Sequence, residues 1–109
     1  MININIIRDK EGFVWEFTIE GHADAGEEGK DIVCAAVSAV AYTALGALGE
    51  LAGIEQYIEE DGYMNCHIPL DIAGEEKYKA QIILDTMVIG FKQIEFAYKK
   101  FVSVMDEEV

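Results

Sequence analysis

The stretch from Asp31 to about Leu51 constrains the fold most, because it has a helical pattern and yet is apolar on nearly all sides. A helix of this kind must be covered on more than one face. Small residues along it allow a sheet or a second helix to approach closely, and Gly53 is a suitable stop residue. Its larger apolar positions are Ile32, Val33, Val37, Val40, Tyr42, Leu45, Leu48 and Leu51.

Two hairpins provide a sheet for this helix to cover. Ile2, Ile4 and Ile6 alternate with polar residues, a turn follows at residues 9–12, and a second alternating run carries Phe13, Trp15, Phe17 and Ile19 on one side. Residues 54–60 and 63–69 form a second hairpin, because Asp61-Gly62 between them is a strong two-residue turn signal. Alternation there places Met64, Cys66 and Ile68 on one face and His67 on the other.

A second helix is predicted from about Gly74 to Tyr98. The alternation from Phe101 to Met105 is compatible with a short last strand. Residues 106–108 are predicted to form an acidic tail exposed to solvent. The predicted apolar stripe of the helix is Tyr78, Ile82, Met87, Phe91, Ile94 and Tyr98. We therefore expect a two-layer α+β domain of order β-β-α-β-β-α, with a mostly antiparallel sheet and two helices on one face.

Length and composition restrict the class of protein further. A chain of 109 residues, half of them apolar, is predicted to form a single domain spanning 1–109. The start MININIIRDK has no basic signal-peptide region, and no uninterrupted apolar run has the length of a membrane span, so we expect a cytoplasmic protein without membrane contact. Two cysteines in that compartment are expected to be free thiols.

The formal net charge of −13 argues against direct binding to nucleic acid, where a basic patch supplies most of the affinity. The same charge would attract a basic protein. Cys66 and His67 are predicted to point in opposite directions along a strand, and no close-spaced ligand motif occurs elsewhere, so we expect no metal site and no cofactor.

The chemistry of the sequence is concentrated in residues 21–38, GHADAGEEGKDIVCAAVS. With Asp31 as N-cap, Cys34 would be the third helical residue, where free backbone N–H groups and the helix dipole stabilise a thiolate. His22 lies twelve positions earlier and would be available as a base. Asp24, Glu27 or Glu28 would suit its orientation, and the sequence does not choose among them. A cysteine in this setting also suits a small buried apolar residue, and Ser38, one turn along, equally suits a backbone-bonded helix serine.

This stretch resembles the signature of the ribosomal-processing cysteine proteases of bacteria: a Gly-His pair at 21–22, a glycine-containing loop, and GKDIVCAAVS at 29–38. The resemblance extends over the length and element order of the chain. It implies an endopeptidase that removes the N-terminal extension of large-subunit ribosomal protein twenty-seven, acting as a homodimer. By the same resemblance Cys34 is the nucleophile, His22 its base, and Asp31 and Ser38 are supporting positions. Gly21, Gly26 and Gly29 are expected to let the loop close over the peptide.

The sequence leaves three alternatives to this hypothesis. A non-catalytic module of the same fold would hold a ribosomal protein through its acidic surface. A cysteine phosphatase needs an arginine a few residues after the nucleophile, and residues 35–40 contain no basic side chain. A thiol-dependent acyl transferase is harder to exclude, although nothing marks a site for a second substrate.

Overall fold

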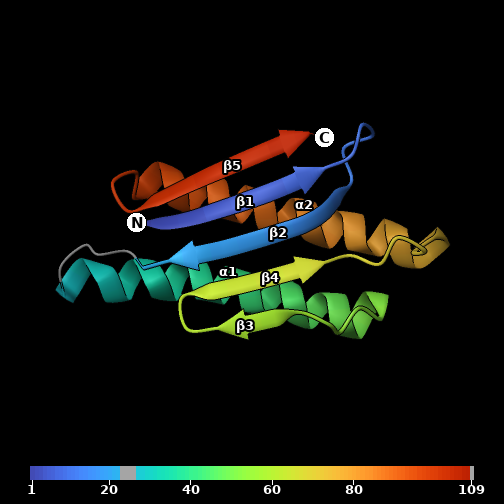
Figure 1. Cartoon of the computed structure of the whole chain (residues 1–109), viewed down its shortest axis with the longest axis horizontal. Helices are drawn as coiled ribbons and strands as arrows, with labels where there is room; N and C mark the ends of the chain where they lie inside the picture. Colours follow the sequence, from blue (N-terminus) through green and yellow to red (C-terminus); the bar gives the residue numbers. More distant parts are fainter. Residues whose placement is uncertain (23–26, 109) are drawn as a thin grey trace.

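The computed structural model describes residues 1–22 and 27–108, with side chains omitted for residues 27–31. The elements follow in the order β1 (Ile2–Arg8), β2 (Val14–Gly21), α1 (Glu27–Ala52), β3 (Ile58–Glu60), β4 (Tyr63–His67), α2 (Gly74–Ala97) and β5 (Val102–Glu108). Over the described ranges the strands form one five-stranded sheet with the order β3-β4-β2-β1-β5. Both helices lie on one face of this sheet (Figure 1). The predicted α+β class and layer arrangement are confirmed.

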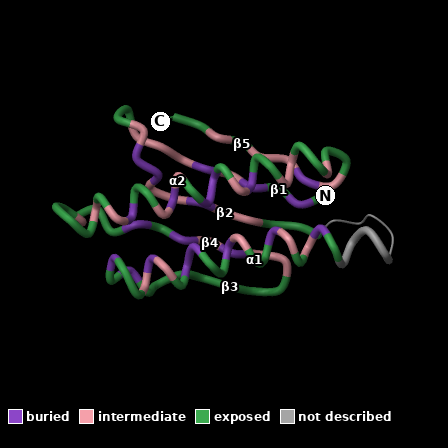
Figure 2. Tube along the Cα trace, turned by 180° about the vertical axis from the view of Figure 1, so that it is seen from behind, coloured by how far each residue is buried: buried purple, intermediate pink, exposed green. Residues whose placement is uncertain are grey.

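The core lies between the sheet and the helices, and the register of the strands explains which residues enter it. Ile4 pairs with Ile19, and Ile19 with Met64, so one apolar row crosses three strands on the helix side. Figure 2 shows the buried positions along β1, β2 and β4 and on one side of each helix. On the opposite face the amide of Asn65 donates to Glu16 and Thr18, so that face is polar.

The second strand departs from the simple alternation predicted for it. The register shifts between Ile7 and Arg8, so that Arg8 pairs with Val14 while Ile7 pairs with Glu16, which leaves Trp15 as the extra residue of a bulge. Val14 is therefore buried together with Phe17, whereas Trp15 is only half-buried and its indole N–H donates to Asp9. The predicted alternation is therefore wrong for Val14, which the bulge brings to the buried side, while Trp15 still packs against the core beside Phe13.

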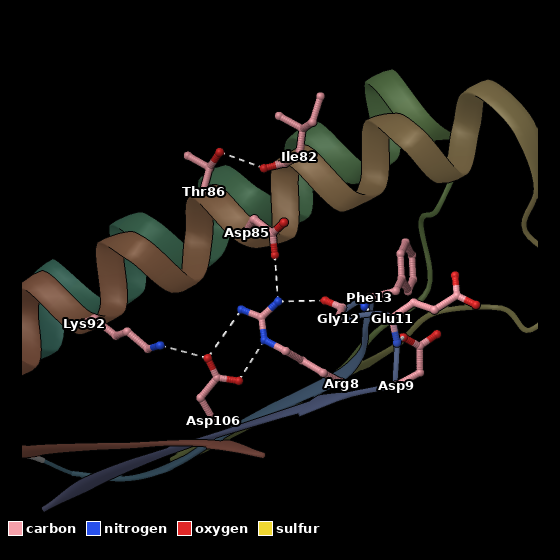
Figure 3. A network of polar contacts seen from close by, with 10 residues as sticks. All are labelled: Arg8, Asp9, Glu11, Gly12, Phe13, Ile82, Asp85, Thr86, Lys92 and Asp106. Atoms are coloured by element: carbon pink, nitrogen blue, oxygen red, sulfur yellow. Dashed lines mark hydrogen bonds and ion pairs between the residues drawn. The ribbon is translucent and has the colours of Figure 1, made fainter. Parts of the chain in front are cut away.

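The C-terminal residues form a full strand rather than a short strand with a solvated tail. β5 extends to Glu108 and pairs parallel to β1 along its whole length. Asp106, predicted to be in the tail, accepts a hydrogen bond of 2.8 Å from Nε of Arg8 and one of 2.9 Å from Lys92 (Figure 3). The acidic end is held by its backbone pairing with β1, and the charge of Asp106 is balanced by Arg8 on β1 and Lys92 on α2.

The long apolar helix ends as predicted, with Gly53 at φ +70° and the Ile54 N–H donating to the Leu48 carbonyl six residues earlier. Its segment Ile32–Ala52 has a mean hydropathy of 1.9 and, by length and composition alone, would be long and apolar enough to cross a membrane. In this fold the buried residues of that segment, among them Val37, Ala41 and Leu48, belong to the core.

The apolar stripe predicted for α2 is partly wrong. Tyr78 and Ile82 are exposed, while Ala80, Leu84 and Val88 are buried with the predicted Met87 and Phe91. The larger side chains do not define the buried face of α2, because smaller residues such as Ala80 and Val88 pack against its neighbours.

Candidate active site

A cleft of about 520 Å³ lies between the N-terminal half of α1 and the adjoining end of the sheet. The end of β2, the turn between β3 and β4, and the start of α1 come together at this end of the molecule (Figure 1). The cleft is lined by Ile2, Ile19, Gly21, His22, Cys34, Val37, Ser38, Tyr42, Glu59, Glu60, Asp61, Gly62, Tyr63 and Met64.

The helix wall of the cleft carries Cys34, Ser38 and Tyr42. Residues four apart lie one above another on a helix, so this spacing places all three on one face. The Cys34 side chain is half-buried and packs against the core, whereas Ser38 and Tyr42 are exposed. Cys34 is therefore anchored among apolar neighbours while it borders a cavity open to solvent.

The strand wall brings His22 to the same cleft. His22 directly follows β2, where Gly21 has φ +99° and its N–H donates to the carbonyl of Gly62 over 2.9 Å. The imidazole is exposed, and it lies against the turn that joins β3 and β4. A thiol from α1 and an imidazole from the end of β2 thus lie on the walls of one cavity.

The environment of Cys34 differs from the prediction in one important respect. α1 begins at Glu27, so Asp31 is the fifth helical residue rather than the N-cap, and Cys34 is the eighth. The apolar pattern begins only at Ile32, but Glu, Lys and Asp are acceptable within a helix, and carboxylates favour its first turn. The helix extends through these polar residues beyond the point at which the sequence pattern is visible.

This shift removes the helix terminus from the site. The four free N–H groups of α1 belong to residues 27–30, about 6–10 Å along the axis from Cys34. Dipole effects fall off within the first turn. The predicted stabilisation of a Cys34 thiolate by the helix start, and the use of the same N–H groups for an oxyanion, are wrong for this conformation.

The glycine predictions have mixed outcomes. Gly21 ends β2 beside the cleft, Gly29 is the third residue of α1 rather than part of a loop, and Gly26 lies outside the described residues, as does Asp24. The side chains of Glu27, Glu28 and Asp31 are also outside the description. The role of these glycines in loop closure stays a prediction.

The second cysteine confirms its predicted place in the core. Cys66 is 1% exposed, and burial raises the pKa of its thiol to about 11. The neighbouring His67 is exposed on the other face of β4, as predicted. Cys66 has the properties of a structural thiol, in contrast to Cys34.

Sequence reasoning missed several residues of the cleft. From the sequence, Tyr42 is predicted only as a large apolar position of the helix. Its spacing from Cys34 and Ser38 is the signal that places it on the same helix face as those two residues. The sequence predicts Glu59, Glu60 and Asp61 as part of a hairpin with no relation to the site, whereas they line the cleft and form its acidic rim. No local signal gives that relation, because it depends on the pairing of β4 with β2.

A half-buried thiol and an imidazole lining one open cleft are the groups that a thiol-dependent hydrolase requires. Residues 1–103 match the model of the family described as cysteine protease Prp, and the chain belongs to that family. It is 35% identical over 102 residues to the ribosomal processing cysteine protease Prp of Bacillus subtilis, covering 91% of each chain. It is also 35% identical over 100 residues to the protein of that name from Staphylococcus aureus, covering 92% of this chain and 93% of the other.

Solved structures show the same fold. A crystal structure of a Streptococcus mutans protein superposes with a TM-score of 0.84 at 32% identity, covering 100% of this chain and 96% of the other. The S. aureus ribosomal processing protease Prp, in complex with a covalently linked product peptide, gives a TM-score of 0.83 at 33% identity and covers 98% and 100% of the two chains. The protein is thus a cysteine protease of the Prp family.

Proposed function

We propose that this protease removes the N-terminal extension of large-subunit ribosomal protein twenty-seven, with Cys34 as nucleophile and His22 as its base. The observation that carries this proposal is the placement of both residues on the walls of one cleft. Cys34 matches the cysteine of the family signature, and Cys66 is sealed in the core. The relatives from B. subtilis and S. aureus are described as ribosomal processing proteases, which supports the substrate class.

The reaction would proceed in two halves. His22 takes the proton of the Cys34 thiol as the sulfur attacks the scissile carbonyl, which forms the C–S bond. The C–N bond then breaks, the amine leaves with the proton from His22, and a thioester remains on Cys34. Water, deprotonated by His22, attacks this thioester and releases the acid and the free thiol. A covalently linked product peptide in the S. aureus relative is consistent with such an intermediate.

Ser38 and Tyr42 would contact the peptide on the helix side of the cleft, because they line it beside Cys34. Glu59, Glu60 and Asp61, all exposed acidic residues, line the cleft on the strand side. In a chain with a net charge of −13 they would favour a basic substrate and disfavour ribosomal RNA. Asp31 is proposed as a supporting position, as the resemblance implies.

The protein is proposed to act in the cytoplasm, as a homodimer formed through its helix layer. A groove of about 530 Å³ runs between α1 and α2, and none of the described residues that line it is charged. Ile82 and Ile89 line this groove and are exposed, so the groove presents apolar side chains to solvent. A second copy would cover this uncharged face with an identical one.

The experiment is incubation with the ribosomal protein carrying its extension, followed by mass measurement of the product. The wild type and Cys66→Ala should both yield the shortened protein, while Cys34→Ala should yield none. His22→Ala should retain a rate lower by about 10²–10⁴-fold, the range for loss of a general base. Binding of the substrate by all four proteins without cleavage by any would support the non-catalytic module instead.

A further inference from the structure

The turn between β3 and β4 holds the candidate base of the active site. Gly62 is the second residue of this two-residue turn, at φ +72°. A β-carbon at Gly62 would lie 2.8 Å from Nε2 of His22, 3.4 Å from Cε1 and 3.5 Å from Cδ2. The imidazole ring therefore occupies the space that any other side chain at position 62 would need.

The backbone beside His22 is fixed by the same turn. The N–H of Gly21 donates to the carbonyl of Gly62 over 2.9 Å, and a β-carbon on Gly21 would collide with the carbonyl oxygen of Met1. Gly21, which directly precedes the residue that carries the imidazole, is thus confined between Met1 and the β3–β4 turn. Met1 leaves no room for a side chain at position 21, and the His22 ring leaves none at position 62. The close approach of these segments therefore depends on glycine at both positions.

From these contacts we infer that Gly62 is a positioning residue for catalysis: it seats the His22 imidazole against the β3–β4 turn, within reach of the cleft that holds Cys34. The inference rests on the proposed role of His22. Position 62 has two separate requirements, a positive φ and an empty β-carbon position. The first serves the hairpin alone, and the second serves the imidazole.

The chain contains a matched control for the first requirement. Gly53 has φ +70°, close to that of Gly62, and a β-carbon there would meet nothing within 4 Å. Gly53 follows the C-terminus of α1, and it is not among the residues that line the cleft. Gly53→Ala therefore introduces the same backbone strain as Gly62→Ala without displacing His22. Asn tolerates positive φ better than Ala, so Gly62→Asn and Gly53→Asn form a second pair with less strain.

The experiment measures kcat and KM for the extended ribosomal protein with both pairs of variants. Gly62→Ala and Gly62→Asn should lower kcat by about 100-fold relative to the matched Gly53 variant, since a misplacement near 1 Å can cost that much. KM should change much less. Equal kcat values within each pair of folded variants would overturn the inference.

Nuclear magnetic resonance gives a readout that does not depend on turnover, because the chain has only two histidines. The ring resonances of His22 should shift in Gly62→Asn and stay in place in Gly53→Asn. His67, exposed on the other face of β4, is the internal reference. Unchanged His22 resonances in Gly62→Asn would also overturn the inference, and this test remains available if Gly62→Ala does not fold.

The same data separate this inference from the proposed function. If His22→Ala retains full activity, the proposed base is wrong. If His22→Ala loses activity while Gly62→Asn retains it, only the seating by Gly62 is wrong.

Discussion

Cys34 and Cys66 occupy opposite environments in one small domain. Cys34 borders an open cleft, whereas Cys66, in β4, is 1% exposed and buried in the core. Burial raises the pKa of Cys66 to about 11, so almost none of it is thiolate at pH 7.5. We predict that iodoacetamide at that pH modifies Cys34 in the native protein and leaves Cys66 unmodified. Peptide mapping by mass spectrometry checks the site. Faster labelling of Cys66, or equal labelling in Cys34→Ala, would contradict this assignment.

Asp106 should contribute measurably to stability, because it joins β5 to Arg8 and Lys92 (Figure 3). Its side chain is 18% exposed. Asp106→Asn should lower the free energy of unfolding at pH 7 by about 1.5–3 kcal/mol, as for a hydrogen bond to a charged group. Urea denaturation measures this change. Asp71→Asn, at an exposed position, is the control and should have little effect.

The same pair of proteins gives a pH test. Burial opposes ionisation of Asp106, but the hydrogen bonds from Arg8 and Lys92 outweigh it and lower the pKa below the ordinary 3.8. The contribution of a carboxyl with a lowered pKa is present above its unfolded pKa and is lost as the pH falls through its folded pKa. The stability difference between wild type and Asp106→Asn should therefore shrink below about pH 4. A difference that grows on acidification would contradict the assignment of this ion pair.

Cleavage of a basic substrate should depend on ionic strength. The chain has a net charge of −13, and Glu59, Glu60 and Asp61 line the rim of the cleft. Because salt screens long-range attraction, kcat/KM should fall as sodium chloride is raised from about 0.05 to 0.5 M. The fall should be smaller for Glu59→Gln combined with Glu60→Gln. A peptide substrate with no net charge is the control and should show little dependence.

Association through the helix layer is testable with charge substitutions. Ile82→Glu combined with Ile89→Glu places two carboxylates beside the uncharged groove between α1 and α2, so a dimer formed there should dissociate. Sedimentation equilibrium should show a dimer for the wild type and a monomer for the double variant. Leu70→Glu, an exposed apolar position between β4 and α2, should leave the dimer intact. A monomeric wild type would remove the dimer from the account.

The sequence supported most of the fold because the decisive signals were local. Asp61-Gly62 specified a hairpin, Gly53 ended the long helix, and alternation placed Met64 and Cys66 in the core. The failures arose where distant contacts decide the structure. Asp106 joins a strand because Arg8, 98 positions earlier in the chain, accommodates its charge.

The candidate site, like the fold, could be predicted where local sequence signals decide it and not where distant contacts do. The residues of the signature, His22, Cys34 and Ser38, do line one cleft. The predicted stabilisation of a Cys34 thiolate by the helix terminus was wrong. The polar residues before Ile32 continue the helix, and no apolar pattern in the sequence marks them as helical. The contact between His22 and Gly62 had no sequence signature, because it depends on how β4 pairs with β2.

Trapping the covalent intermediate tests the central claim most directly. The enzyme is mixed with a slight excess of the extended ribosomal protein, quenched in acid within one turnover and analysed by intact mass and peptide mapping. The account predicts an adduct on Cys34 whose mass equals the released N-terminal peptide less one water, and no adduct in Cys34→Ala. Cleavage by Cys34→Ala, or an adduct on Cys66, would contradict it.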